Sequence, residues 1–519
     1  MPTTVTRRTL LKGATVLGAA GALVEPGLGI AAATGATDPA DLGVLEALSL
    51  LRTRALGAHE LLAACRARIA RHEPTVQAFL LHTEAAADAA ATAADQRYRS
   101  GRPLPLDGIP LGLKDLYYVK DAPTTASSRA LSDFRPAYDA TVWARLRDAG
   151  GVLLGKLNTQ EFALGNATMP TVNPWNTAHT PGGSSGGSAA ALSSRFVLAA
   201  SGSDTAGSIR IPSSACGVVG LKPTYGRVSR HGVITLSWSM DTAGMLARSV
   251  ADVAFLTGLV AGHDPADPTS RDVPVPAYPT MAPRDLRGVR VGIPTTYFWD
   301  AAATQADILA VCRGAVRRLQ DAGATVVDVD LPPVFAEAMA PAPLSDPQAS
   351  PLLLGQSHPA LLITTEAFGY HEALIAQRGG DYSTDILAGI TSGGTVLAPD
   401  YLRTQQLRQV FVRELRGLYQ RADLDVLAHP TLRTDPPATG TRTPANGGLL
   451  NGLALSDLMS PANFAGMPSL SVPVGLSHAG LPVGLCLTGR HFDEGTVLAI
   501  GLVLDDAIGF ARRQPAGLA

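Results

Sequence analysis

Short apolar runs alternate with helical patterns along most of this sequence, and that alternation limits the fold more than any other feature. Runs rich in β-branched residues include VRVGIP, ATVVDVDLP and LDVLAHP. Between them, residues 306–319 and 400–419 repeat apolar side chains at helical spacing. Strands that alternate with helices are typical of α/β proteins. The sequence therefore predicts an α/β fold with a central mixed β-sheet surrounded by α-helices.

A strand that carries a single charge is predicted near residue 110. The stretch GIPLGLKDL alternates branched apolar residues with Pro, Gly and finally Lys114, which is strand periodicity. Before it, residues 58–69 and the alanine-rich run 84–94 show helical spacing. We therefore expect an N-terminal helical layer, followed by a strand that ends in a lone lysine.

The overall charge is close to neutral, with 42 Lys and Arg against 44 Asp and Glu. This balance does not favour a nucleic acid or an anionic surface as a partner, so no nucleic-acid partner is expected. The four cysteines show no CxxC or paired histidine spacing and predict neither a disulfide framework nor a zinc site. They are Cys65, Cys216, Cys312 and Cys486. No metal or other cofactor is expected.

The first residues resemble an export signal. Arg7 and Arg8 precede an apolar run over residues 13–24, and small residues follow as far as Ala33. This pattern is typical of a twin-arginine signal peptide. The twelve apolar residues are too few for a membrane-spanning helix, which needs about 20. The sequence predicts a signal peptide over 1–33 and a single domain over 34–519, located outside the cytoplasm and free of the membrane after cleavage.

A glycine- and serine-rich run, PGGSSGGS, covers residues 181–188. A phosphate-binding loop needs a lysine directly after its glycines, and none follows Gly187. The run also matches the GxSxG pattern of a hydrolase with a Ser-His-Asp triad, but that turn must follow a strand. The preceding NPWNTAHTP is rich in turn formers instead. The triad is therefore a disfavoured alternative, and a flexible linker is disfavoured because the run is short.

A second serine-containing stretch suggests a nucleophile. Small residues at 205–207 directly precede Ser208, so consecutive backbone N–H groups can converge on one point. Such a group of donors stabilises the oxyanion of a tetrahedral intermediate. A serine there needs a base, and a lysine serves if burial lowers its pKa from about 10.4. Lys114, the lone charge of the predicted strand, is a candidate for that base.

Three motifs in order resemble the amidase signature family. They are GIPLGLKD, PGGSSGGS, and GSDTAGSIR followed by CGVVGLKPTYGRVSR. The segment NFAGMPSLSVPVG, with GLPVG ending at Gly484, is similar to the C-terminal segment of that family. The resemblance extends from about residue 41 to about residue 512 and implies the amidase-signature fold.

The resemblance implies a Ser-Ser-Lys triad made of Lys114, Ser184 and Ser208. It also implies a cis peptide bond between Gly183 and Ser184. In the implied mechanism, neutral Lys114 draws a proton through Ser184 while Ser208 attacks an amide carbonyl. The backbone N–H groups implied to hold the oxyanion are those of Thr205, Ala206, Gly207 and Ser208.

Further positions match or depart from the family pattern. Ser185, Asp204 and Arg210 match it, either as structural support or with a direct role. Ala206 replaces a common glycine, and Cys486 replaces a common glutamine. Neither departure removes a catalytic group, so activity is expected.

The main functional expectation is an exported amidase. It would hydrolyse a small-molecule carboxylic amide to an acid plus ammonia or an amine, as a monomer or homodimer. One alternative is the glutaminase subunit of a tRNA-dependent amidotransferase, which shares the triad but passes ammonia to a partner enzyme. The export signal argues against it, because tRNA charging is cytoplasmic. An esterase or aryl acylamidase with the same triad is another alternative, whereas a non-catalytic protein would be expected to lack a triad residue.

The walls of the substrate cleft are predicted in irregular stretches rich in proline and glycine. These are residues 169–177, 332–359 and 433–450. Long irregular segments of a compact enzyme often line its binding cleft.

Overall fold

The computed structural model describes residues 38–346, 348–440 and 455–518. The predicted signal peptide, residues 1–33, lies outside these ranges and stays a prediction. Part of one predicted cleft wall, residues 441–450, lies outside them too. None of the helices in the described ranges is both long and apolar enough to cross a membrane.

The described residues form one mixed sheet of 11 strands in the order β1-β3-β2-β4-β6-β5-β10-β11-β9-β7-β8. The strands are β1 (Phe79–His82), β2 (Pro110–Lys114), β3 (Val152–Leu157), β4 (Ala199–Asp204), β5 (Val219–Lys222), β6 (Thr242–Ala247), β7 (Arg290–Pro294), β8 (Thr325–Val329), β9 (Val426–Pro430), β10 (Ser469–Leu476) and β11 (Pro482–Gly489). Parallel pairs join β3, β2 and β4, and also β9, β7 and β8. The strands between them are antiparallel, so the predicted mixed α/β fold is confirmed.

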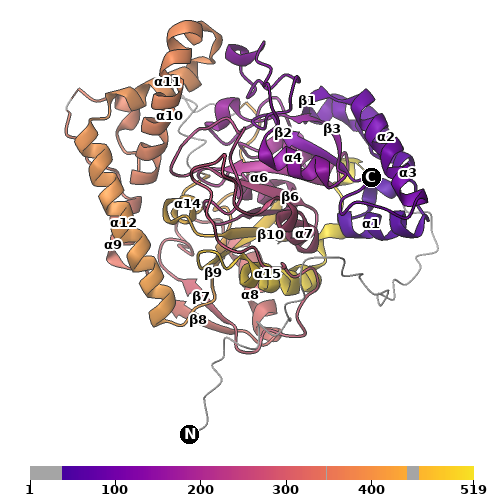
Figure 1. Cartoon of the computed structure of the whole chain (residues 1–519). Coiled ribbons are helices and arrows are strands. Elements are labelled where there is room, and N and C mark those ends of the chain that lie inside the picture. The colour runs from indigo at the N-terminus through magenta and orange to yellow at the C-terminus, as the bar shows by residue number, and fades with distance from the viewer. Residues whose placement is uncertain (1–37, 347, 441–454, 519) are drawn as a thin grey trace. The chain divides into compact units, whose positions relative to one another are not determined.

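Helices pack around this sheet (Figure 1). They are α1 (Val44–Thr53), α2 (Ala58–Val76), α3 (Glu84–Arg99), α4 (Thr141–Asp148), α5 (Gly186–Ser193), α6 (Arg210–Cys216), α7 (Val250–Val260), α8 (Ala306–Asp321), α9 (Pro333–Met339), α10 (His358–Arg378), α11 (Thr384–Ser392), α12 (Ala398–Arg421), α14 (Ser460–Ala465) and α15 (Glu494–Ile508). The indigo helices α1 to α3 and the orange helices α10 to α12 lie on opposite sides of the sheet.

Most of the predicted elements are present. Helices α2 and α3 confirm the N-terminal helical layer, and α8 and α12 cover the two later helical patterns. The stretch 332–359 differs from the prediction, because α9 forms inside it. Pro333 begins that helix, where its missing N–H would have no helical partner anyway. A proline that we interpreted as a loop signal therefore starts a helix.

The centre of the sheet is buried on both faces. Every residue of β2, β4, β5 and β6 is buried. Helix α5 is also buried along its whole length, because its small residues (GGSAAALS) allow close packing. Strands β2 and β4 are parallel neighbours, so their carboxyl ends meet at one edge of the sheet. Open α/β sheets commonly bind ligands at such an edge.

Candidate active site

Lys114, at the carboxyl end of β2, is surrounded by hydroxyl groups. Its Nζ lies 2.8 Å from Ser184 Oγ, 2.9 Å from Ser185 Oγ and 2.9 Å from Ser203 Oγ. Its backbone N–H donates to Ser201 Oγ at 3.0 Å. The lysine is fully buried, and the described residues provide it with no ion pair within 4 Å. Three neutral hydroxyl oxygens therefore contact the nitrogen of the only ionisable side chain on this strand.

The surroundings of Lys114 favour its neutral form. Burial lowers the pKa of Lys114 to about 7, against the opposing charges of Asp241 and Asp204. A neutral amine has two N–H groups and one lone pair, so of three hydroxyl neighbours two can accept and one can donate. Ser185 Oγ lies 3.3 Å from the carbonyl of Ser203, to which it donates, so it can accept from Nζ. Of the other two hydroxyls, Ser184 and Ser203, one can accept from Nζ while the other donates its proton to it.

The loop before α5 is held by the backbone of Ser184. Its carbonyl accepts from Gln160 N at 3.1 Å, Thr159 Oγ1 at 3.0 Å and Thr168 Oγ1 at 3.2 Å. The Gly183–Ser184 peptide bond is cis, as the family resemblance implies. A Cβ atom at Gly183 would lie 2.6 Å from Thr168 Oγ1, so glycine is required by close approach. These contacts fix the hydroxyl of Ser184 next to Lys114.

The turn of residues 205–208 lies between β4 and α6 and is called the donor turn below. The carbonyl of Ser208 accepts from Ser185 N at 3.2 Å, which places this turn against the Ser184 loop. In the described part of the chain, the N–H groups of Thr205, Ala206 and Ser208 have no hydrogen-bond acceptor. They remain candidates for an oxyanion site.

Gly207 differs from the other predicted donors. Its N–H donates to Asp204 Oδ1 at 2.7 Å, so it is already occupied. Its φ of +117° is a left-handed conformation that favours glycine. The sequence predicts four oxyanion donors at this turn, and the structure leaves three of them open. Gly207 shapes the turn instead.

Asp204 organises this turn from inside the protein. Its two oxygens accept from Arg210 Nε and Nη2, each at 2.9 Å, and both side chains are fully buried. Asn463 Nδ2 also donates to Asp204 Oδ1 at 2.9 Å. Burial raises the pKa of Asp204, but the charge and hydrogen bonds of Arg210 outweigh it and bring that pKa below its usual value. Asp204 and Arg210 therefore support the turn and lie behind it.

Cys486, the second departure from the family pattern, lies behind the same ion pair. Its Sγ is 3.0 Å from Ser469 Oγ, which also accepts from Arg210 Nη1 at 3.3 Å. All four cysteines are buried and form no disulfide bond. The described residues include no group of three or more His, Cys, Asp and Glu side chains that could hold a metal ion.

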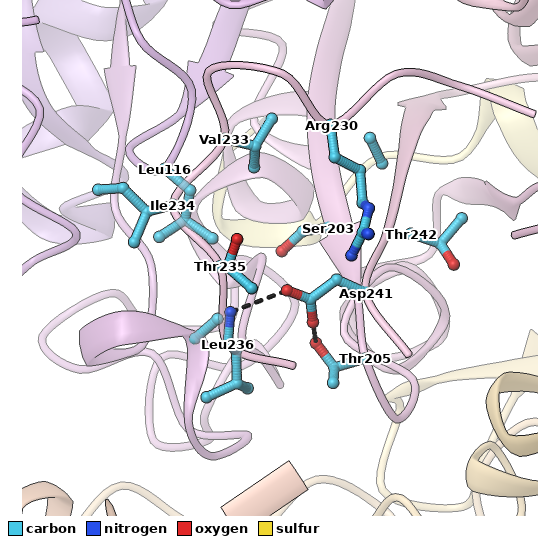
Figure 2. A pocket seen from close by; sticks show the side chains of 12 residues that line it. Leu116, Ser203, Thr205, Arg230, Val233, Ile234, Thr235, Leu236, Asp241 and Thr242 are labelled. Carbon is cyan, nitrogen blue, oxygen red and sulfur yellow. Dashed lines mark hydrogen bonds between the residues drawn. The ribbon is translucent and has the colours of Figure 1, made fainter. Parts of the chain in front are cut away.

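A small hollow is lined in part by Ser203, one of the three serines around Lys114 Nζ (Figure 2). Its volume is about 10 Å³, which is room for about one water molecule. It is lined by Leu116, Ala163, Ser203, Thr205, Arg230, Val233, Ile234, Thr235, Leu236, Asp241, Thr242 and Ala243. Most of these residues belong to the stretch 230–243, which the sequence analysis did not single out.

The predicted cleft walls do not line this hollow. None of the described residues in the stretches 169–177, 332–359 and 433–450 contributes to it. Because the hollow holds about one water molecule, the walls of a substrate cleft stay a prediction. The stretch that supplies most of the lining of the hollow, RHGVITLSWSMDTA, is mostly apolar and hydroxylic. Ser203 was also missed. It is the second residue of the motif GSDTAGSIR, directly before Asp204, but the motif was used only for its later residues.

Comparison with known proteins identifies the family. The family model "Amidase" matches residues 60–498. This chain belongs to the amidase family. In structure, this amidase is similar to the peptide amidase of Stenotrophomonas maltophilia, with a TM-score of 0.75 and 31% identity over 91% of this chain and 98% of that one. It is also similar to the A subunit of the glutamyl-tRNA(Gln) amidotransferase of Thermotoga maritima, with a TM-score of 0.72 and 28% identity over 90% and 95%.

The curated relatives correct our main functional expectation. The A subunit of a glutamyl-tRNA(Gln) amidotransferase from Chloroflexus aggregans is 43% identical over 89% of this amidase and 95% of that protein. Further relatives, down to 37% identity, have the same name. The expectation of an exported amidase with only a small-molecule substrate is therefore wrong. The same names, which include a tRNA and denote one component of a larger enzyme, overturn the expectation of no nucleic-acid partner and of a monomer or homodimer.

Proposed function

We propose that this amidase is the glutaminase subunit of a tRNA-dependent amidotransferase, releasing ammonia from the side-chain amide of glutamine. The observation that supports this most is the identity of 37–43% with the A subunits of curated amidotransferases over 86–90% of the chain. This function is one of the alternatives that the sequence left open. In this proposal the ammonia passes to a partner protein that acts on aminoacyl-tRNA.

The proposed chemistry starts with Lys114 in its neutral form. Lys114 accepts the proton of Ser184, and Ser184 accepts that of Ser208 as the Ser208 oxygen attacks the amide carbon. The negative charge on the carbonyl oxygen is held by backbone N–H groups of the donor turn. Ser184 then returns a proton to the leaving nitrogen, which departs as ammonia. Water attacks the resulting ester, which releases glutamate and restores the Ser208 hydroxyl.

The geometry around Lys114 supports an amide substrate. Cleavage of an amide requires that a proton be delivered to the leaving nitrogen, because an unprotonated amide nitrogen is a poor leaving group. A buried amine that exchanges a proton with Ser184 at 2.8 Å can accept and return that proton within one catalytic cycle. The proposal assigns this shuttle to Ser184 and the nucleophile to Ser208.

Ammonia release from a set of amides tests the proposal. The purified chain is given glutamine, benzamide and hexanamide in parallel, together with the variants Ser208→Ala and Ser100→Ala. Ser100 follows α3 and is exposed, so Ser100→Ala is the matched control and should equal the wild type. Glutamine should be the best substrate, and Ser208→Ala should lose roughly 10³-fold or more of the rate. Cleavage of benzamide or hexanamide with glutamine inert would reject the glutaminase assignment.

The predicted export signal conflicts with this function. An exported chain would not meet aminoacyl-tRNA, which is made in the cytoplasm. Residues 1–33 lie outside the described ranges, so the twin-arginine segment stays a prediction of the sequence. Its test is a measurement of where the protein accumulates in the cell.

A further inference from the structure

A buried carboxylate beside the site has no role in the chemistry described so far. Asp241 is the residue directly before β6, and it faces the same hollow as Ser203, Thr205 and Arg230 (Figure 2). It is 7% exposed. Burial raises the pKa of Asp241, so holding a charge there is costly. A buried carboxylate of this kind is usually retained for its contacts.

The two oxygens of Asp241 join two parts of the site. Oδ1 accepts from the hydroxyl of Thr205, the first residue of the donor turn, at 2.6 Å. Oδ2 accepts from the backbone N–H of Leu236 at 2.8 Å and of Ser237 at 3.1 Å. One side chain therefore ties the donor turn to the wall of the hollow. Because Thr205 supplies one of the open N–H groups, its orientation depends on this contact.

Asp241 is also the unpaired carboxylate that acts on Lys114. The other charged groups near Lys114 form the buried pairs Asp204 with Arg210 and Asp115 with Lys156. The guanidinium of Arg230 lines the same hollow and its charge acts on Asp241, but in the described residues the two side chains form no ion pair within 4 Å. The remaining neighbours of Lys114 are neutral hydroxyls. One of them, Ser203 Oγ, lies 2.9 Å from Lys114 Nζ and lines the hollow together with Asp241, so Asp241 lies on the Lys114 side of the site.

We propose that Asp241 is a positioning residue of this active site. It holds Thr205 so that the donor turn faces the substrate carbonyl, and it presents a negative charge to Lys114. The two effects have separate consequences. The contact with Thr205 sets the rate at which Ser208 reacts, and the charge sets the pH at which Lys114 becomes neutral. The proposal rests on the roles of Ser208 and Lys114 in the proposed function.

Phosphonylation of Ser208 by a fluorophosphonate measures both effects without an amide substrate. The reaction needs the activated serine and the oxyanion site but not glutamine. The rate is measured against pH for the wild type, Asp241→Asn and Thr205→Val, with Ser208→Ala as the unlabelled reference. If Ser208 is phosphonylated as expected but the chain does not cleave glutamine, that result counts against the proposed function and not against the role of Asp241.

Asp241→Asn should change both features of the profile. Without the negative charge, Lys114 loses its proton at a lower pH, so the acid limb should move down by about one pH unit. The plateau rate should fall roughly tenfold, because the amide group reverses the hydrogen bond to Thr205. Thr205→Val keeps the charge of Asp241, so it should lower the plateau and leave the acid limb in place.

Glu366 on α10 provides a matched control. Its carboxylate accepts from Ser237 Oγ and Ser239 N, so it holds the same wall, but it does not contact Thr205. Glu366→Gln removes one negative charge and should leave the acid limb unchanged. A wild-type profile in Asp241→Asn, or an equal shift in Glu366→Gln, would overturn the proposal. An unchanged plateau in Thr205→Val would overturn the positioning of the turn, even if Asp241→Asn failed to fold.

Discussion

At the scale of single residues, Lys114 owes its chemistry to what surrounds it. A surface lysine is charged at neutral pH, and only burial without an ion-pair partner makes it a base. The three serines around its Nζ supply hydrogen bonds without supplying charge. If a carboxylate replaced one of these hydroxyls, it would form an ion pair with Lys114. That ion pair would keep the lysine protonated, so Lys114 could not act as a base.

The pH dependence of acylation follows from this environment. Burial lowers the pKa of Lys114 to about 7, so the amine is charged below that pH and neutral above it. The rate of amide cleavage should therefore rise as the pH increases through about 7, following a single proton, and Lys114→Met should lower kcat/KM by roughly 10²- to 10⁴-fold. A kcat/KM profile that stays flat from about pH 5 to pH 9 would contradict the role of Lys114 as base.

Gly207 and Ala206 form a natural matched pair on the donor turn. A Cβ atom at Gly207 would lie 2.6 Å from Met459 Cβ and 2.7 Å from Ile211 Cδ1, at a positive φ. Gly207→Ala should lower the free energy of unfolding by about 1–3 kcal/mol and reduce acylation. Ala206→Gly adds no atom and should cost about 1 kcal/mol or less. Equal urea midpoints for the two variants would show that the turn tolerates a methyl group at either position.

The sequence predicted some residues of the site better than others. Lys114 and Ser184 lie in separate motifs, and the structure brings them together at 2.8 Å, whereas the role of Ser208 stays a prediction. Ser203 and Asp241 were not predicted, although Ser203 lies in the motif GSDTAGSIR, because each reaches the site through strand pairing. Ser203 meets Lys114 across the β2–β4 pair, and β6 brings Asp241 beside β4. Contacts of that kind have no signature in one stretch of sequence.

At the scale of secondary-structure elements, the site depends on the junctions between strands and helices. β2 and β4 end at the same edge of the sheet, and α5 and α6 begin there. Strand periodicity predicted β2 among these elements, whereas β4 and α6 were not predicted. Helix α9 and the start of α10 were not predicted, because both lie in the stretch 332–359, which was interpreted as irregular from its prolines and glycines.

The ion pair between Asp204 and Arg210 fixes the junction of β4 and α6. Both side chains are fully buried, so Arg210→Met leaves an unpaired buried carboxylate. This should lower the free energy of unfolding by about 3–5 kcal/mol. The exposed pair of Arg287 with Asp285 is the control, and Arg287→Met should cost about 1 kcal/mol or less. The free energy of unfolding is measured by urea unfolding for both variants. If Arg210→Met and Arg287→Met lose comparable amounts, the buried pair is not what stabilises the junction.

At the scale of the whole molecule, the general fold was predictable and the biological role was not. The family motifs and the N-terminal arginines led to an exported amidase, the neutral charge balance led to no nucleic-acid partner, and the relatives overturned both expectations. The triad chemistry is common to both functions, so it could not separate them.

The location of the protein in the cell can be measured directly. The twin-arginine prediction expects accumulation outside the cytoplasm, abolished in the double variant Arg7→Lys, Arg8→Lys. The proposed glutaminase function expects the wild type in the cytoplasm, and no effect of the double variant. Fractionation of cells followed by immunoblotting distinguishes the two. If the wild type is exported and the double variant is not, an amidotransferase role in aminoacyl-tRNA synthesis is rejected.

The most direct test of the proposed function follows the amide nitrogen of glutamine. The chain takes the place of the glutaminase component in a reconstituted glutamyl-tRNA(Gln) amidotransferase, supplied with glutamine labelled with ¹⁵N in its side-chain amide. We predict that ¹⁵N appears in the aminoacyl group of the tRNA with the wild type and is absent with Ser208→Ala. Failure to release labelled ammonia from glutamine, in an enzyme that still cleaves other amides, would contradict the account.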